Sequence, residues 1–337
     1  AALRELGGVA PEMPAAPTAP AVQPVTEREA EPEIAEPKRA RPVVLAWSED
    51  QETGIDLAKE KWIGQVREVT LGATAEDGGT RTKTVTVGGQ ATMPFLDFEG
   101  DTGHKPALAI EIQDRKPTDW SPLLMEVWGD VAHDPGEWAR AAEEAGADLI
   151  VLRLSLTDEN DEPNTPEHAC EATRKVLDAT GLPLIVLGPG QVDPDNELLV
   201  PVAEAASGER IVLGMCEEKN YRTIVAAALA HNQLVIARTA MDVNLAKQLN
   251  ILISDMGLPL DRILMDPTCA AVGYGMEYGY SVMERLRLSA LQGDSMTQLP
   301  MLVTVGEEAW RQKESKVGDD VPKPGESGRN GPSTGRR

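Results

Sequence analysis

Residues 147–155 read ADLIVLRLS, a short apolar run followed by polar residues. A run of this length is typical of a β-strand that is buried on both faces of a sheet. Similar runs recur at 107–113 (ALAIEIQ), 182–188 (LPLIVLG), 210–215 (RIVLGM), 233–238 (QLVIAR), 262–266 (RILMD) and 300–306 (PMLVTVG). We therefore expect strands at 107–113, 148–154, 183–187, 210–214, 233–237, 262–265 and 300–305.

Segments with alanine, leucine and glutamate at helical spacing separate these runs, for example EWARAAEEAGA at residues 137–147. Strands that alternate with helices are joined by right-handed crossovers and lie parallel. The fold class expected is therefore α/β, a (β/α)8 TIM-type barrel, with function on the loops at the C-terminal ends of the strands. The helices are expected at 135–146, 166–180, 194–207, 218–231, 241–256 and 278–292.

The eighth β/α unit of such a barrel is missing from the pattern. From Gly318 the chain reads GDDVPKPGESGRNGPSTGRR, which contains no apolar run. Seven strands do not close a barrel of this type with normal shear. Three explanations are open: a tail altered by a frameshift, which we favour, a strand from another chain, or a strand from the N-terminal region.

The rest of the chain divides by composition. Residues 1–42 are rich in proline, alanine and glutamate, which is typical of a disordered linker. Residues 43–100 form an N-terminal extension in which 66–71 and 82–87 flank the turn AEDGGT, a predicted β-hairpin. We expect this hairpin to plug the N-terminal end of the barrel or to lie elsewhere on its surface. The barrel takes 101–317 and a disordered tail takes 318–337.

Charge and cysteine content exclude several function classes. The formal net charge of −23 argues against binding to nucleic acid or to an anionic membrane. No apolar stretch approaches the roughly 18 residues that a membrane span needs. The three cysteines, Cys170, Cys216 and Cys269, are widely spaced and form no CxxC motif, so we expect neither disulfides nor an iron–sulfur or zinc site in this chain. A cytoplasmic location follows as an expectation.

Residues at the predicted strand ends line the mouth of the barrel, yet they form no compact acid–base pair. The most distinctive loop is 266–278, where glycine and tyrosine alternate and where backbone can approach a flat ligand closely. A packed turn at the rim is the simpler interpretation of the same loop. Asn220 can hydrogen-bond a heterocycle, whereas Glu217 and Glu218 suit a helix N-terminus. Candidate ligand-binding residues are Gly188, Gly190, Asn220, Arg238, Thr239, Thr268, Gly273, Tyr274 and Gly275.

No histidine lies at a predicted strand end, so we expect no catalytic or metal-binding residue. His231 suits the C-terminus of the helix at 218–231, and His104, His133 and His168 are interpreted as surface or capping residues. Cys269 lies in the mouth loop, but nothing nearby in sequence would lower its pKa. It is interpreted as buried and unreactive.

Two long runs resemble a known family. They are VGGQATMPFLDFEGDTGHKPALAIEIQD at 87–114 and DRILMDPTCAAVGYGMEYGYSVMERLRLSALQGDSMTQLPM at 261–301. The chain resembles, from about Trp62 to Lys316, the small (delta) subunit of the corrinoid iron–sulfur protein of the acetyl-CoA synthase/carbon monoxide dehydrogenase system. The missing eighth unit departs from that family's pattern and puts barrel closure in question.

The resemblance implies a heterodimer with a larger (gamma) subunit, which carries the iron–sulfur cluster and most contacts to a shared corrinoid (cobalamin). It implies that the complex accepts a methyl group from methyltetrahydrofolate through a methyltransferase and delivers it to acetyl-CoA synthase in the reductive acetyl-CoA (Wood–Ljungdahl) pathway of carbon fixation. The loops 188–190, 216–221, 238–244 and 266–278 would cover one corrin face without ligating cobalt. Two alternatives stay open: a self-sufficient pterin-dependent methyltransferase, in which Asp266 and Asn220 bind the pterin, and a structural scaffold subunit.

Overall fold

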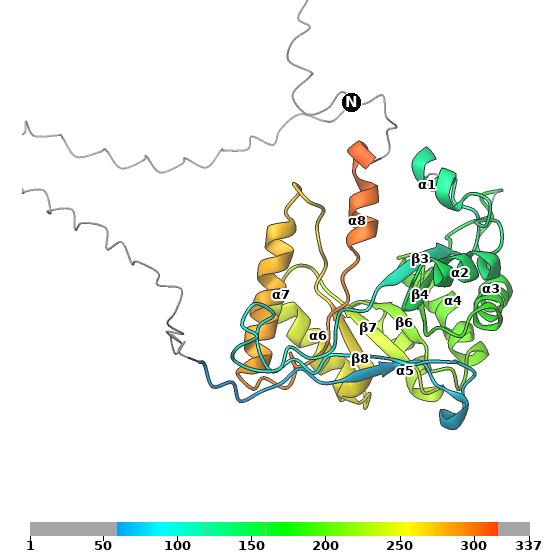
Figure 1. Cartoon of the computed structure of the whole chain (residues 1–337). Coiled ribbons are helices and arrows are strands. Elements are labelled where there is room, and N and C mark those ends of the chain that lie inside the picture. Colours follow the sequence, from blue (N-terminus) through cyan, green and yellow to red (C-terminus); the bar gives the residue numbers. More distant parts are fainter. Residues whose placement is uncertain (1–58, 119, 159, 316–337) are drawn as a thin grey trace, which may run out of the picture. The chain divides into compact units, whose positions relative to one another are not determined.

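The computed structural model describes residues 59–118, 120–158 and 160–315. The predicted linker at 1–42, the part of the extension before residue 59 and the predicted tail at 318–337 lie outside these ranges. The described residues hold a parallel sheet with helices along its outer side (Figure 1).

Six strands make the sheet, and they pair in the order in which they occur along the chain. All five neighbouring pairs are parallel. The strands are β3 (Ala109–Gln113), β4 (Leu149–Arg153), β5 (Leu184–Leu187), β6 (Val212–Cys216), β7 (Leu234–Arg238) and β8 (Ile263–Asp266). The expected α/β class of alternating parallel strands and helices is confirmed.

One long helix follows each of the six strands, as the pattern predicts. The long helices are α2 (Pro135–Glu144), α3 (Pro166–Ala179), α4 (Val192–Ala205), α5 (Tyr221–Ala230), α6 (Val243–Asp255) and α7 (Met276–Leu291). Asp134 caps α2 by accepting the backbone N–H groups of Gly136 and Glu137. Asp242 does the same for α6. These caps satisfy N–H groups that have no partner inside the helix, and they fix where each helix begins.

Strands β4 to β8 are buried on both sides, whereas the edge strand β3 buries only Ile112. Ile150 and Leu152 of β4 point into a cluster shared with the helices, whereas Leu149 and Val151 point into a second cluster on the inner side of the sheet. Because side chains alternate along a strand, two apolar clusters require apolar residues at consecutive positions. This is why the strand sequences read as unbroken apolar runs.

The strand expected at 300–305 is wrong in extent. The structure reduces it to a single parallel bridge between Met265 and Met301. Met265 N donates to Pro300 O at 2.9 Å and Leu302 N donates to Met265 O at 2.8 Å. The chain then enters the helix α8 (Val305–Arg311) and the 3-10 turn η3 (Lys313–Ser315). Up to residue 315 no eighth unit follows, and β3 stays an edge strand within the described ranges.

The hairpin lies at the N-terminal end of the barrel strands. β1 (Val69–Leu71) pairs antiparallel with β2 (Val85–Val87), and η1 (Ala75–Asp77) lies in the connection between them. Val69 and Leu71 join the inner apolar cluster of the sheet. Gly72 N donates to Arg210 O at 3.1 Å, just before β6 begins. Of the two placements left open by the sequence, the plug at the N-terminal end is therefore confirmed.

A short helix that the sequence pattern did not predict lies between β3 and α2. It is α1 (Pro122–Trp128), and none of its residues is buried. Trp120, just before it, meets the buried Trp138 of α2 edge to face, with ring centroids 5.1 Å apart. This aromatic contact ties the loop after β3 to the outer helix layer.

Candidate functional site

The C-terminal ends of the strands form the mouth, and the predicted residues at the end of β5 have structural roles there. A Cβ on Gly188 would lie 2.3 Å from Asp195 Oδ1 on α4, so glycine is needed for this close approach. Gly190 N donates to the same Asp195 oxygen at 2.9 Å. Burial raises the pKa of Asp195, although the backbone hydrogen bonds with Gly190 and Gln191 work against that shift. Gly188 and Gly190 thus shape the β5–α4 turn, and their contact with a ligand stays a prediction.

Asn220 has a different role from the one expected. Its side chain is buried, its Oδ1 accepts Glu217 N at 2.7 Å and its Nδ2 donates to Met215 O at 3.0 Å. Both ends of the amide are therefore used to close the turn after β6. Because both ends of the amide are engaged, this geometry argues against Asn220 as a residue that hydrogen-bonds a heterocyclic ligand. The local sequence does not indicate these backbone partners.

Arg238, Thr239 and Thr268 are brought together around Asp266. Arg238 and Asp266 are register partners on β7 and β8, and Arg238 Nε lies 3.6 Å from Asp266 Oδ2. Thr268 N donates to Asp266 Oδ1 at 2.9 Å, and Thr268 adopts a left-handed backbone with φ of 62°. The Thr268 hydroxyl also donates to Thr239 O. Here the predicted proximity of strand-end residues is realised.

Two polar atoms in this cluster lack a hydrogen-bond partner among the described residues, Asp266 Oδ2 and Thr239 Oγ1, although Asp266 Oδ2 keeps its ion pair with Arg238. Asp266 is only 1% exposed, and burial raises the pKa of its carboxyl group while Arg238 opposes the shift. A cavity of about 300 Å³ lies beside the cluster, lined by Arg238, Thr239 and Thr268 with Leu245 and Leu249. Thr239 lines this cavity, so its hydroxyl is the polar group of the cluster that is suited to bond a ligand there.

Replacing Asp266 with asparagine is expected to raise the urea midpoint of unfolding at pH 7. A carboxyl whose pKa is raised by folding binds protons more readily in the folded state, so its ionisation destabilises the fold as pH rises. The gain in Asp266→Asn should therefore shrink as pH falls toward 4. Asp97→Asn, at an exposed site, is the matched control and should show no such pH dependence. An equal effect of both variants at both pH values would contradict the burial argument.

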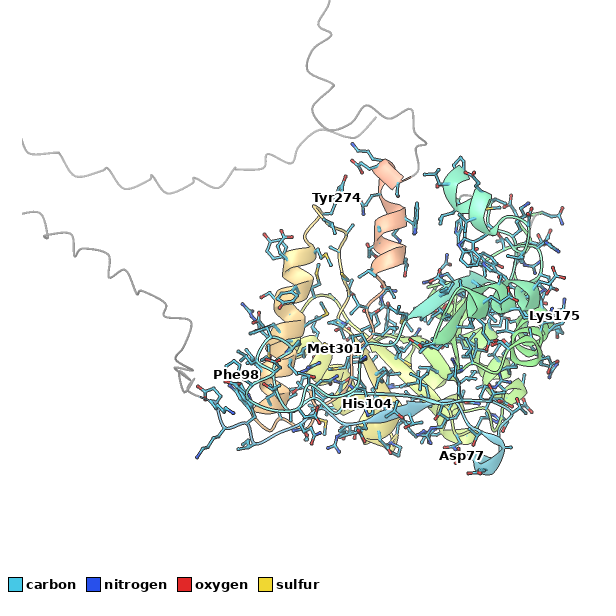
Figure 2. The ribbon with its side chains drawn as sticks, viewed as in Figure 1. Asp77, Phe98, His104, Lys175, Tyr274 and Met301 are labelled. Atoms are coloured by element: carbon cyan, nitrogen blue, oxygen red, sulfur yellow. The ribbon has the colours of Figure 1, made fainter. Side chains whose placement is uncertain are left out.

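The glycine–tyrosine loop projects beyond the strand ends. Gly273 and Gly275 have φ of 79° and 105°, a left-handed backbone that favours glycine, and a Cβ on Gly273 would meet nothing within 4 Å. Val272 is 80% exposed and Tyr278, in the first turn of α7, is 67% exposed. Figure 2 shows Tyr274 at the tip of this loop. Residues with so much exposed apolar surface do not fit the other interpretation of this loop, a packed turn at the rim.

A second, larger cavity that sequence reasoning missed lies on the other side of the mouth. It encloses about 500 Å³ between β3, β4, α1 and α8. Three of the chain's six tryptophans line it, namely Trp120, Trp128 and Trp310. The only signal in the sequence was the pair Trp120 and Trp128 in the long loop after the first predicted strand.

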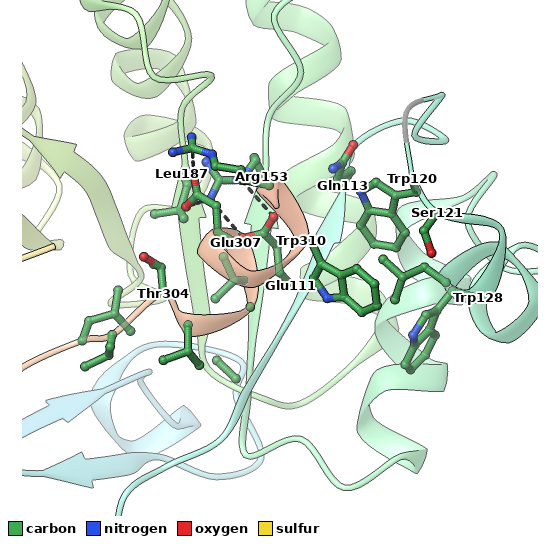
Figure 3. Close-up of a pocket in the computed structure, with 18 of the residues that line it drawn as sticks. Glu111, Gln113, Trp120, Ser121, Trp128, Arg153, Leu187, Thr304, Glu307 and Trp310 are labelled. Atoms are coloured by element: carbon green, nitrogen blue, oxygen red, sulfur yellow. Dashed lines mark hydrogen bonds and ion pairs between the residues drawn. The ribbon is translucent and has the colours of Figure 1, made fainter. Parts of the chain in front are cut away.

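Arg153 lines this cavity together with Glu111 and Glu307 (Figure 3). Its Nε and one Nη donate to the two oxygens of Glu111 at 2.9 and 3.0 Å, and the same Nη donates to Glu307 of α8 at 2.9 Å. Burial alone would lower the pKa of Arg153, but the bonds and charges of the two carboxylates raise it above its ordinary value. The guanidinium therefore stays charged and binds α8 to the sheet.

A polar cluster surrounds Asp114 at the ends of β3 and β4. The buried carboxylate of Asp114 accepts Ser155 N at 2.8 Å and Asn164 Nδ2 at 2.8 Å. His168 Nε2, in the first turn of α3, lies 3.4 Å from the same carboxylate. His168 is therefore not the simple surface residue that was expected, whereas His231 does cap the end of α5. The cluster fixes the loop between β4 and α3.

The cysteines lie apart on three different elements: Cys170 in α3, Cys216 at the end of β6 and Cys269 in the loop after β8. Burial raises the pKa of the Cys216 and Cys269 thiols, so both are poor nucleophiles near neutral pH. Within the described ranges no three or more His, Cys, Asp or Glu side chains are grouped to hold a metal ion. Those ranges also contain no helix of the length and apolarity needed to cross a membrane.

Comparison with known proteins identifies the family. The family model for the CO dehydrogenase/acetyl-CoA synthase delta subunit matches residues 68–322. The chain belongs to this delta-subunit family. The matched range begins in the β1–β2 hairpin and includes the whole sheet and its mouth, so the family assignment covers the fold and the candidate site together.

Curated relatives of the delta-subunit family agree. The acetyl-CoA decarbonylase/synthase complex subunit delta of Archaeoglobus fulgidus is 38% identical over 92% of this chain and 66% of its own length. The subunit of the same name from Methanosarcina mazei is 36% identical over 76% of this chain and 58% of its own length. The chain thus spans less than two thirds of the length of these relatives.

Solved structures resemble the chain only distantly. Xanthomonas albilineans dihydropteroate synthase aligns with 59% of this chain and 71% of its own at 14% identity, with a TM-score of 0.41. The tryptophan synthase alpha chain of Legionella pneumophila covers the same shares at 13% identity, with a TM-score of 0.35. At these scores the fold assignment rests on the strand order and register of the chain itself.

Proposed function

We propose that this delta-family chain is a subunit of a corrinoid methyl carrier and that its mouth covers one face of a corrinoid held mainly by a larger partner subunit. The observation that carries the proposal is the loop 271–278, which exposes Val272 and Tyr278 at the strand ends of a chain whose relatives are named as complex subunits. Exposed apolar and aromatic residues gathered at one rim are typical of a surface that another molecule covers.

The residues at this rim fit a covering role. The space above Gly273 lets a flat ring approach the backbone, and Tyr274 and Tyr278 offer aromatic faces beside it. The Thr239 hydroxyl, which has no hydrogen-bond partner among the described residues and belongs to a residue lining the smaller cavity, suits an amide group of a ligand's side chain. A bound corrinoid would supply the cobalt that carries the methyl group. This chain's part is to position the ring and exclude water, without a ligand to the metal.

All four histidines of the chain lie away from the glycine–tyrosine loop at 271–278, which we call the rim loop. His104 contacts Glu68 at the hairpin, His133 contacts Glu137 on α2, His168 contacts Asp114, and His231 ends α5. If cobalt took a histidine ligand, that histidine would therefore come from a partner. The iron–sulfur cluster, the methyltetrahydrofolate methyltransferase and acetyl-CoA synthase are assigned to partner proteins in the same proposal.

The test is co-purification with the larger corrinoid-carrying subunit, followed by a visible absorption spectrum of the complex. Val272→Asp should weaken the complex about tenfold or more, because a carboxylate at a buried contact loses its hydration. Val200→Asp, on the outer side of α4 where the valine is 36% exposed, should leave the complex unchanged. Equal retention of the corrinoid-carrying subunit by both variants would contradict the proposal.

The alternative of a self-sufficient pterin-dependent methyltransferase is favoured by one observation: Asp266 Oδ2 accepts no hydrogen bond within the described residues and could accept a pterin N–H. The internal hydrogen bonds of Asn220 count against it. Titration of the isolated chain with methyltetrahydrofolate by calorimetry separates the two functions. Tight binding that Asp266→Asn abolishes would favour the methyltransferase. A scaffold role, by contrast, predicts that Gly273→Val weakens assembly while the corrinoid spectrum stays unchanged.

A further inference from the structure

Residues 305–315, which comprise α8 and η3 and which we call the mouth segment, stand upright in the mouth between the glycine–tyrosine loop and α1 (Figure 1). At its base, Glu307 accepts a hydrogen bond from Arg153 at 2.9 Å. At its top, Glu314 accepts the Tyr274 hydroxyl at 2.7 Å. The mouth segment is thus tied at one end to the sheet and at the other to the rim loop.

Among the described residues, these two are the only side-chain hydrogen bonds that join the mouth segment to the rest of the chain. α8 has seven residues and none of them is buried. Val305 is 51% exposed and Trp310 is 39% exposed. A helix of this length is not stable by itself, so its position depends on tertiary contacts. The two contacts of Glu307 and Glu314 are accordingly the interactions that determine where the segment lies.

The two ends differ in strength. The side chain of Glu307 is 12% exposed and that of Arg153 is 19% exposed, so this ion pair is largely shielded from water. Glu307 also pairs with Arg311 one turn along α8, at 2.7 Å. The Tyr274–Glu314 hydrogen bond lies at the surface, where water competes for both groups. The top of the segment should therefore open more readily than its base.

In its present position the mouth segment competes with a ligand for Tyr274. Tyr274 is one of the residues that the proposed function gives to a flat ligand, and in this structure its hydroxyl is taken by Glu314. A ligand that bonds the Tyr274 hydroxyl would have to displace Glu314 from it. The mouth segment thus engages the tip of the loop at Tyr274, while Val272 and Tyr278 stay exposed.

We propose that the mouth segment is a built-in gate, closed over the rim loop by the Tyr274–Glu314 bond and hinged at the Arg153–Glu307 pair, and that it swings away when the corrinoid-carrying partner docks. The docking half of this inference rests on the proposed function. The closed state does not, because it follows from contacts within the chain.

Hydrogen exchange of the free chain, followed by mass spectrometry, tests the closed state. Tyr274→Phe removes one hydroxyl and should speed exchange of the amides at 305–315 about two- to fivefold. Glu307→Ala should speed it about tenfold. The matched controls are Tyr278→Phe and Glu277→Ala, which alter exposed residues at the start of α7 and should leave the exchange of 305–315 unchanged.

Unchanged exchange of 305–315 in both Tyr274→Phe and Glu307→Ala would overturn the gate. For the docking half, addition of the corrinoid-carrying subunit to the unsubstituted chain should speed exchange at Lys313–Ser315. Slower exchange at these residues would mean that the mouth segment stays closed in the complex, and would overturn the proposal that docking opens it. If exchange of 305–315 is faster in the variants but Val272→Asp does not weaken the complex, the closed segment is supported and the proposed function is rejected.

Discussion

Replacing Arg81 with alanine is expected to lower the free energy of unfolding by about 3–5 kcal/mol, because it leaves a buried carboxylate without its partner. Arg81 Nε donates to Glu209 Oε2 at 2.9 Å, and its two Nη atoms donate to the carbonyls of Thr180 and Leu177 at 2.7 Å each. Its side chain is 2% exposed. Arg81 thus attaches the hairpin to the C-terminal end of α3 and to the segment before β6.

Urea unfolding followed by circular dichroism measures this effect. Arg67→Ala, an exposed arginine that precedes β1 on the same hairpin, is the matched control and should cost less than about 0.5 kcal/mol. The double variant Arg81→Ala/Glu209→Gln should recover part of the loss, because the unpaired charge is then absent. A loss in Arg81→Ala no larger than in Arg67→Ala would show that the hairpin is not anchored in this way.

Replacing Arg153 with methionine is expected to cost about 2–3 kcal/mol and to release the mouth segment. The substitution keeps the apolar stem of the side chain but leaves Glu111 and Glu307 facing each other without the cation between them. We expect two results together: a lower urea midpoint and faster exchange at 305–311 than at any other helix.

The matched control is Arg222→Met, because Arg222 lies on the exposed face of α5 and stacks on Tyr221 instead of pairing with an acid. It should change neither quantity measurably. If Arg153→Met lowers stability without loosening 305–311, the ion pair supports the sheet but does not hold α8, and the hinge assigned to it is wrong.

The strands could be predicted from sequence because burial on both faces leaves a strong local signal. β5 was expected at 183–187 and spans Leu184–Leu187. β6 was expected at 210–214 and spans Val212–Cys216, a shift of two residues. Strand ends depend on hydrogen bonds to neighbours and on turns, which an apolar run does not encode.

The helices that were not predicted are α1 and α8. Both are seven residues long and contain no buried residue, so neither carries the apolar periodicity from which helices are predicted. The contact that places α8 joins Arg153 and Glu307, which are 154 residues apart in the chain. Long-range ion pairs of this kind leave no local pattern, and the cavity between the two helices was missed for the same reason.

The candidate site was predictable in part. Strand-end position alone brought Arg238, Thr239 and Thr268 together, because parallel neighbours end at the same edge. It did not reveal that Asn220 bonds to its own turn, or that Gly188 is needed for the approach of Asp195. Those roles depend on hydrogen-bond partners and close contacts that form only when α4 and the turn after β6 have packed against the sheet.

A photocross-link from the rim tests the central claim most directly. A benzophenone amino acid in place of Tyr278 should cross-link to the corrinoid-carrying subunit in the assembled complex, because Tyr278 lies 67% exposed beside the rim loop. The same probe in place of Leu229, 37% exposed on the outer side of α5, should give no cross-link. A cross-link from position 229 and none from position 278 would contradict the account, since the partner would then cover the outer helices and leave the mouth free.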